Sequence, residues 1–167
     1  MKLGIISDTH NHIENTRRAV EIFRERDVER IIHCGDLTTT PIVDLFKGLK
    51  VTFVFGNMDH SHADLMTAAK KYFGIGSMGY HYTANIEGRR IAVCHGDDDE
   101  LLSRFIFADI YDFVFHGHTH SRRDKLVGQT RVINPGAIGG KQTEPRSVSI
   151  LDLETEEAEF VILEDEV

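Results

Sequence analysis

The first half of the chain repeats one pattern three times: a short apolar run, a polar loop, and a segment with apolar residues at helical spacing. The apolar runs are nearly continuous, which is typical of strands buried on both faces of a parallel sheet. The second helical segment is expected to have Thr40 as its cap and Pro41 in its first turn. Right-handed crossovers would join these units into one parallel sheet. The expected strands are residues 2–7, 30–34 and 51–55, and the expected helices are residues 14–26, 41–46 and 63–72.

The pattern changes at Gly79, after a short glycine-rich segment, residues 74–79, that joins the two halves. Apolar or alternating runs now come in pairs separated by tight turns, which indicates hairpins. We therefore predict an α/β fold of two packed mixed β-sheets, a β-sandwich flanked by helices, in one domain spanning residues 1–167. The expected elements are strands 80–86, 90–94, 112–115, 122–127, 130–133, 146–153 and 157–163, and a helix over 98–108.

Length, charge and cysteine content narrow the classes of function. The two cysteines, Cys34 and Cys94, stand in apolar runs and are expected to be small core residues without a disulfide. No apolar run approaches the length of a membrane span and no cleavable signal precedes the first strand, so we expect a cytoplasmic protein without a membrane partner. The net charge of −8 disfavours binding to long nucleic acids but not to small substrates. The acidic segment 154–166 is expected to form a charged edge that blocks strand association.

Polar side chains follow six of the apolar runs, at the points where the predicted strands end. The carboxyl ends of strands in an open α/β sheet converge on one crevice, so loops far apart in sequence are expected to meet there. Carboxylate, amide and imidazole groups together can hold two divalent metal ions when one carboxylate bridges them. Five of the six loops carry the candidate ligands, which are Asp8, His10, Asp36, Asn57, His95, His118 and His120.

Each of these motifs is weak evidence by itself. Three histidines in five residues can form a solvated turn, and an Asp-x-His sequence is often a turn with a capping aspartate. A protein nucleophile finds little support, because Ser7 and Cys34 border the predicted crevice without the sequence context of an activated serine or cysteine. The order of the motifs, each at a strand end, favours a metal centre over these alternatives.

Taken together, the motifs resemble those of the calcineurin-like metallophosphoesterases, and in particular the small prokaryotic phosphodiesterases of the YfcE type. The resemblance spans nearly the whole chain. It rests on Asp-x-His at residues 8–10, Gly-Asp at 35–36, Gly-Asn-x-Asp at 56–59, His-Gly at 95–96, Gly-His-x-His at 117–120 and Val-Ile-Asn-Pro-Gly at 132–136. It implies the two-sheet fold and an enzyme that hydrolyses small phosphodiesters with a hydroxide activated by two metal ions.

The resemblance also implies a role for each ligand position. Asp8, His10 and His120 would hold one metal ion, Asn57, His95 and His118 the other, and Asp36 would bridge the two. Asp36 and Asn57 are therefore expected to act in catalysis as well as in metal binding. Mn²⁺ is expected for such mixed oxygen and nitrogen ligands, with Fe²⁺, Ni²⁺ and Zn²⁺ as alternatives.

The loop of residues 56–59 departs from the wider family, in which a histidine often stands at the position of Met58. That histidine is associated with stabilising the transition state or protonating the leaving oxygen, and methionine cannot donate a proton. His60 is the expected substitute, with His12 and Asp97 as alternatives. Asp59 is expected to orient a ligand or to cap the loop.

Two other functions fit the same resemblance. A small scaffold subunit of retromer shares the fold and a similar Ile-Asn-Pro-Gly segment, yet it works as a protein-interaction module and departs from the full ligand set. A recombination-type nuclease is disfavoured by Met58, by the acidic charge and by the absence of a capping domain. Because all seven ligand positions are filled, we favour the enzyme over the scaffold. A homodimer is one candidate for the oligomeric state, which does not follow from the sequence.

Overall fold

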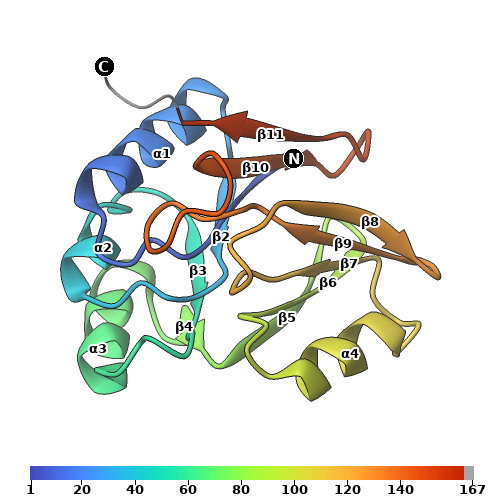
Figure 1. The fold of residues 1–167 in the computed structure, drawn as a ribbon, viewed down its shortest axis with the longest axis horizontal. Helices are drawn as coiled ribbons and strands as arrows, with labels where there is room; N and C mark the ends of the chain where they lie inside the picture. Colours follow the sequence, from blue (N-terminus) through green and yellow to red (C-terminus); the bar gives the residue numbers. More distant parts are fainter. Residues whose placement is uncertain (164–167) are drawn as a thin grey trace.

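The computed structural model describes residues 1–163, which form two β-sheets packed face to face with helices on both outer sides (Figure 1). Helices α1 (Ile13–Glu25), α2 (Thr40–Asp44) and α3 (His62–Phe73) lie on one side, and α4 (Asp99–Phe107) lies on the other. The predicted fold of two mixed sheets flanked by helices is confirmed.

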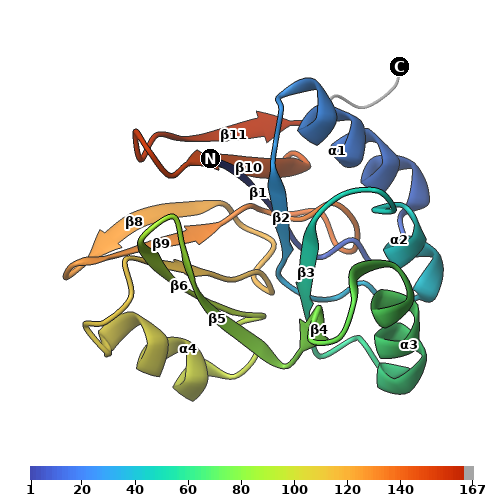
Figure 2. The ribbon, with the colours of Figure 1, turned by 180° about the vertical axis from the view of Figure 1, so that it is seen from behind.

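The first sheet contains the first four strands of the chain and the last two. Its order is β11-β10-β1-β2-β3-β4, with β1 to β4 parallel and β10 antiparallel to β1. The C-terminal hairpin thus returns across the molecule to lie beside the N-terminal strand (Figure 2). The strands are β1 (Lys2–Ile6), β2 (Arg30–His33), β3 (Val51–Val54), β4 (Met78–Gly79), β10 (Ser147–Asp152) and β11 (Ala158–Ile162).

The second sheet is built from the middle of the chain, in the order β5-β6-β7-β9-β8. Two antiparallel hairpins, β5/β6 and β8/β9, form its outer parts, and β7 pairs in parallel with β6 on one side and β9 on the other. The strands are β5 (His81–Ile86), β6 (Arg89–Cys94), β7 (Phe113–Phe115), β8 (Arg123–Val127) and β9 (Thr130–Asn134).

The apolar core follows these layers. One buried cluster, including Phe23, Phe46 and Phe53, fills the space between helices α1 to α3 and the first sheet. A second lies between the sheets, where Ile5 of β1 and Phe115 of β7 are fully buried. A third joins α4 to the outer face of the second sheet. Strands β1, β2, β3, β6 and β7 are covered on both faces, which explains their continuous apolar sequences.

Two predicted details differ from the structure. Helix α2 has Thr39, not Thr40, at its N-cap, and the Thr39 side chain makes no capping hydrogen bond; Pro41 in the first turn supplies the local helix signal. Residues 78–79, expected to be part of a flexible connection, form the short strand β4 beside β3. Pairing with an existing strand edge can order a segment whose own sequence has little strand character.

Several other predictions can be compared with the structure. Cys34 and Cys94 are buried free thiols, as predicted. Strand β11, part of the acidic segment 154–166, is the edge strand of the first sheet, whereas residues 164–166 of that segment lie outside the described residues. Among helices of residues 1–163, none combines the length and apolar character needed to cross a membrane.

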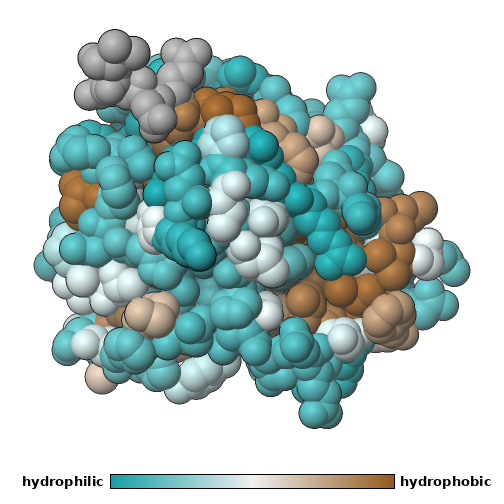
Figure 3. Space-filling view, in the orientation of Figure 1, coloured by the Kyte–Doolittle hydropathy of each residue, from teal (hydrophilic) through white to brown (hydrophobic). Residues whose placement is uncertain are grey.

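The surface is largely hydrophilic, in keeping with the net charge of −8 (Figure 3). The main apolar area in this view lies at the right, over β8 and the end of α4. The exposed apolar residues of these segments are Phe107 at the end of α4, Ile110 after it and Leu126 of β8. This area is on the side of the molecule opposite helices α1 to α3.

Candidate metal centre

The loops that follow β1, β2, β3, β6 and β7 carry all seven predicted ligands and come together where the two sheets meet. Backbone hydrogen bonds tie these loops in pairs: the His10 amide donates to the Asp36 carbonyl at 2.9 Å, and the Gly117 amide donates to the His95 carbonyl at 2.8 Å. The convergence of strand ends is therefore continued by direct contacts between the loops themselves.

Five of the seven ligand positions adopt a left-handed backbone conformation. Residues other than glycine seldom do so, and backbone strain of this kind gathers at functional sites. Each φ angle lies between 43° and 67°, and the residues are Asp8, His10, Asp36, His118 and His120. This local conformation turns the side chains out of the strand direction and into the shared space between the loops.

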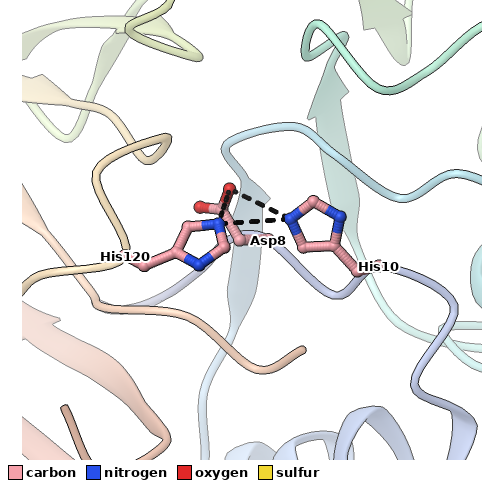
Figure 4. A group of neighbouring side chains, drawn as sticks. All are labelled: Asp8, His10 and His120. Carbon is pink, nitrogen blue, oxygen red and sulfur yellow. Dashed lines mark hydrogen bonds and ion pairs between the residues drawn. The ribbon is translucent and has the colours of Figure 1, made fainter. Parts of the chain in front are cut away.

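Asp8, His10 and His120 form the first cluster (Figure 4). The Oδ1 atom of Asp8 lies 3.2 Å from Nε2 of His120 and 3.6 Å from Nε2 of His10, and the two Nε2 atoms are 3.2 Å apart. Nδ1 of His120 donates to the Lys141 carbonyl at 2.7 Å. In the neutral ring this hydrogen bond leaves the lone pair on Nε2, the atom that faces the cluster.

Asp36, Asn57, His95 and His118 form the second cluster. Oδ1 of Asn57 lies 3.2 Å from Nε2 of His95 and 3.1 Å from Nδ1 of His118. Nδ1 of His95 donates to the Cys34 carbonyl at 2.8 Å, so Nε2 of the neutral ring again carries the lone pair that faces inward.

Asp36 lies between the two clusters. Its Oδ2 atom is 3.5 Å from Nε2 of His10 and 3.3 Å from Nε2 of His95. Oδ1 of the same carboxylate accepts a hydrogen bond from the Met58 amide at 2.8 Å, which fixes the orientation of the group. One oxygen is thus held by the protein while the other faces both histidines.

The residues present fit a site for divalent cations. Oδ1 of Asp8 is buried and has no hydrogen-bond partner of good geometry among residues 1–163, although three imidazole nitrogens lie within 4 Å of it. A buried carboxylate oxygen without such a partner is costly unless a cation or proton compensates it. Oxygen and imidazole donors together suit divalent transition metals.

The electrostatics of the two clusters are coupled. Burial acts to raise the pKa of the Asp8 carboxyl, but the neighbouring imidazoles of His10 and His120 outweigh it and hold that pKa well below its usual range. Burial also acts to lower the pKa of His95, yet the carboxylates of Asp36 and Asp8 raise it to about 9. Cation binding at these ligands would therefore displace protons, as expected for imidazole ligands.

Asp59 supports the site from behind. Its Oδ2 atom accepts hydrogen bonds from the amides of Asp36 at 2.9 Å and Gly56 at 2.8 Å, and its Oδ1 atom accepts from the Thr38 amide at 2.6 Å. The side chain is buried, and this burial raises its pKa while the three amides act in the opposite direction. Asp59 thus caps its own loop and ties it to the loop that carries Asp36.

Close packing explains the glycines of the motifs. A Cβ atom at Gly117 would lie 1.8 Å from Oγ of Ser7 and 2.5 Å from Oδ2 of Asp8, and one at Gly56 would lie 2.1 Å from Oδ1 of Asp36. A glycine is required where the backbone of one loop passes this close to a ligand of another. The sequence motifs contain these glycines, but the close approach that requires them is visible only in the structure.

The candidate proton donors take different positions. His60 and Asp97 are exposed and line a cavity that also contains Asn57 and His95. His12 is the N-cap of α1, where its Nδ1 atom accepts from the Asn15 amide at 3.3 Å. His12 therefore has a structural role of its own, whereas the other two line the cavity beside the ligands.

One supporting residue received no role from the sequence. Nδ2 of Asn134 donates to the Gly117 carbonyl at 2.8 Å and to Oγ1 of Thr119 at 3.1 Å, which holds the loop that bears His118 and His120. The signal that could have identified it is its place at the end of β9, in the Asn-Pro-Gly segment.

Comparison with known proteins gives consistent results. The model of the calcineurin-like phosphoesterase superfamily domain matches residues 1–156. The phosphodiesterase MJ0936 of Methanocaldococcus jannaschii is 34% identical over 166 residues, which are 98% of this chain and 100% of the relative. A solved structure of a novel archaeal phosphodiesterase has a TM-score of 0.90 at 34% identity, covering 98% of this chain and 100% of that one.

A more distant structure, that of the E. coli phosphoesterase Yfce, has a TM-score of 0.69 at 19% identity, covers 98% of this chain and 100% of its own, and shows the shared fold. The family match extends over all five loops that carry the two clusters. The fold, the convergence of these loops and the match over most of the chain lead to one conclusion: this protein belongs to the calcineurin-like phosphoesterase superfamily.

Proposed function

We propose that the protein is a phosphodiesterase that hydrolyses small phosphodiesters with the help of two divalent cations. The observation that carries this proposal is the position of Asp36, whose Oδ2 atom faces His10 of one cluster and His95 of the other at 3.5 and 3.3 Å. A carboxylate in this position suits two cations that share a ligand. The relationship to MJ0936, which is named a phosphodiesterase, supports the reaction class.

Two cations in such a site supply an activated hydroxide and offset the negative charge of the phosphate. Asp8, His10 and His120 would hold one of them and Asn57, His95 and His118 the other, with Asp36 shared. The chain's own contribution is to fix these groups. The hydrogen bonds from His95 to Cys34 and from His120 to Lys141 hold both imidazoles with their free nitrogens inward.

The donor set supports Mn²⁺ as the cation, with Fe²⁺, Ni²⁺ and Zn²⁺ as competitors. Two carboxylates, one amide oxygen and four imidazoles offer a mixture of oxygen and nitrogen atoms and no thiolate. Cys34 borders the site, but its thiol is buried and that burial raises its pKa, which disfavours a thiolate ligand.

His60 is our proposed proton donor to the leaving oxygen. It is exposed on the cavity that contains Asn57 and His95, whereas His12 is engaged as a helix cap. Asp97 lines the same cavity and is the competing candidate. The test is the dependence of the diester hydrolysis rate on leaving-group pKa: His60→Ala should steepen it, whereas His81→Ala, an exposed histidine outside the cavity, should not.

The full ligand set favours an enzyme over the protein-interaction scaffold expected as the alternative, since a scaffold does not require seven converging donors. The decisive experiment is metal analysis after reconstitution with Mn²⁺, together with hydrolysis of bis(p-nitrophenyl) phosphate. Asp36→Ala should reduce bound cations from about two per chain to below one and abolish hydrolysis. Asp109→Asn, an exposed and left-handed aspartate elsewhere, is the matched control.

Asp36→Ala protein that retains two cations would contradict the shared-ligand role. Wild-type protein that binds two cations but hydrolyses no diester with any of the four metals would overturn the proposed activity. Comparison of p-nitrophenyl diesters with alkyl monoesters tests the substrate class. Met58 stands where the wider family often has a histidine, so poor leaving groups are expected to depend on His60 as the remaining donor.

A further inference from the structure

A cavity of about 410 Å³ opens directly beside the candidate metal centre. It shares Asn57 and His95 with that centre, so a group esterified to a phosphate held there would lie within reach of the cavity. Its volume is within the range of sites for small ligands. The cavity is therefore placed to receive one substituent of a phosphodiester.

One wall of the cavity is aromatic and is assembled from three separate elements. Phe55 follows β3, His62 begins α3, and Tyr80 lies between β4 and β5. The ring centroids are 4.3 Å apart for Phe55 and His62, 5.2 Å for Phe55 and Tyr80, and 5.4 Å for His62 and Tyr80. This cluster is called the aromatic wall below.

Tyr80 is the exposed member of the aromatic wall. Phe55 is buried, whereas 66% of Tyr80 is accessible to solvent. The Tyr80 hydroxyl and Nδ1 of His62 are 3.1 Å apart, so a hydrogen bond steadies the ring although most of it is uncovered. A planar ligand can therefore stack on a ring that is already held in place, which limits the entropy lost on binding.

The cavity also carries acidic groups from the loop after β6. Oδ1 of Asp98 accepts a hydrogen bond from the Leu101 amide at 2.9 Å and caps α4. Asp97 is exposed and also lines the cavity. Carboxylates here repel a second anionic group and accept hydrogen bonds from hydroxyl or amino groups. The occupant is therefore an uncharged group that combines a planar ring with hydrogen-bond donors.

A nucleoside has this combination of properties. We propose that the cavity binds the nucleoside portion of a phosphodiester substrate, with the base stacked on Tyr80 and a sugar hydroxyl donating to Asp97. This inference rests on the proposed phosphodiesterase function and specifies its substrate class. A simple aryl group would use the same stacking surface without needing the acidic wall, so the experiment must separate the two.

The test uses two chromogenic diesters that share one leaving group: the p-nitrophenyl ester of thymidine 5′-monophosphate and methyl p-nitrophenyl phosphate. Tyr80→Ala should lower the ratio of kcat/KM for the thymidine ester to that for the methyl ester by about tenfold, mainly through KM, because base stacking is lost. Tyr80→Phe keeps the ring and should keep the ratio within about twofold. Phe107→Ala removes another exposed aromatic side chain, outside the cavity, and is the control.

Binding without turnover gives an independent measurement. Calorimetric titration of the Mn²⁺-loaded protein with thymidine 5′-monophosphate should show affinity about tenfold weaker for Tyr80→Ala than for wild type, and unchanged for Phe107→Ala. Asp97→Ala should weaken the same binding about threefold or more. Urea unfolding of Tyr80→Ala establishes that the variant is folded before either measurement.

If Tyr80→Ala lowers kcat/KM equally for both esters, the nucleoside assignment is wrong and the ring contacts the aryl leaving group instead. If Tyr80→Ala changes neither the ratio of the two kcat/KM values nor the affinity for thymidine 5′-monophosphate, the cavity is not a substrate site. Either result leaves the phosphodiesterase proposal standing. Failure of the wild type to hydrolyse either ester would instead overturn that proposal, and the calorimetric comparison would still decide whether Tyr80 binds a nucleotide.

Discussion

Asp59 offers the sharpest test of how the ligand loops are held together. It is buried, and its side chain binds these loops through their backbone amides. Its carboxylate accepts from the amides of Asp36, Thr38 and Gly56. Asp59→Ala leaves all three donors without their partner, and two of them belong to buried residues. We expect the variant to lose the support of both ligand loops.

The magnitude follows from the number of donors. A buried backbone group that loses its hydrogen bond costs roughly 1–3 kcal/mol. Three such groups, one of them half-buried and open to replacement by water, give an expected loss of about 3–6 kcal/mol in the free energy of unfolding. That is a large fraction of the free energy of unfolding of a typical domain, about 5–15 kcal/mol, so Asp59→Ala is expected to be only marginally stable.

Asp59→Asn is the milder variant. Its amide oxygen can still accept from two of the donors, while its amide nitrogen faces the third and cannot accept from it. We expect the free energy of unfolding to fall by about 1–3 kcal/mol, the cost of one buried donor left without an acceptor. The assay is urea unfolding of the cation-free protein at pH 7, followed by Mn²⁺ binding to the folded variant.

The control is Asp109→Asn, at an exposed position with φ of 57°, a conformation that asparagine adopts readily. It should change the free energy of unfolding by less than about 0.5 kcal/mol. The reasoning is refuted if Asp59→Ala unfolds within 1 kcal/mol of wild type, or if it binds both cations with unchanged affinity.

Three further predictions follow from other parts of the site. Gly117→Ala places a methyl group 2.5 Å from Oδ2 of Asp8, so the variant should bind fewer cations than wild type. Gly79→Ala is the control, because the nearest atom to its methyl group is 3.6 Å away. Equal cation content in the two variants would contradict this prediction. Burial lowers the pKa of His33 to about 3 from 6.5, so the unfolded chain binds one more proton between these values. The contribution of this histidine to the free energy of unfolding is complete above pH 6.5 and falls by about 1.4 kcal/mol per pH unit as the pH drops towards 3. His33→Gln should therefore reduce the difference in the free energy of unfolding between pH 7 and pH 5, measured by urea unfolding. Met58→His should leave cation content unchanged and speed hydrolysis most for diesters with poor leaving groups, so an unaltered leaving-group dependence would argue against proton donation from this position.

Much of the site could be predicted from local sequence. Each ligand follows a short apolar run, and such runs are typical of strands buried on both faces. Since the carboxyl ends of parallel strands lie at one edge of a sheet, Asp8 after β1 and Asp36 after β2 had to be neighbours. The two-sheet architecture followed in the same way from the change to paired runs after Gly79.

The partners of the ligands could not be predicted, because they depend on contacts between loops far apart in sequence. Lys141 orients His120 through its backbone carbonyl, which leaves no trace in the type of side chain at that position. Asp59 was recognised as a supporting residue, but its three partners became visible only with the loops in place. Backbone acceptors and donors are present at nearly every residue, so sequence alone does not select among them.

The tertiary structure alone decided what lies next to the site. The spacing of apolar residues indicated most of the strands, the helices and the ends at which the ligands stand, because burial imposes a pattern on the sequence. It did not determine that β10 returns to pair with β1, or that Phe55, His62 and Tyr80 meet in one wall. Both depend on which surfaces remain uncovered once the two sheets have packed, and that is a property of the whole chain rather than of any segment.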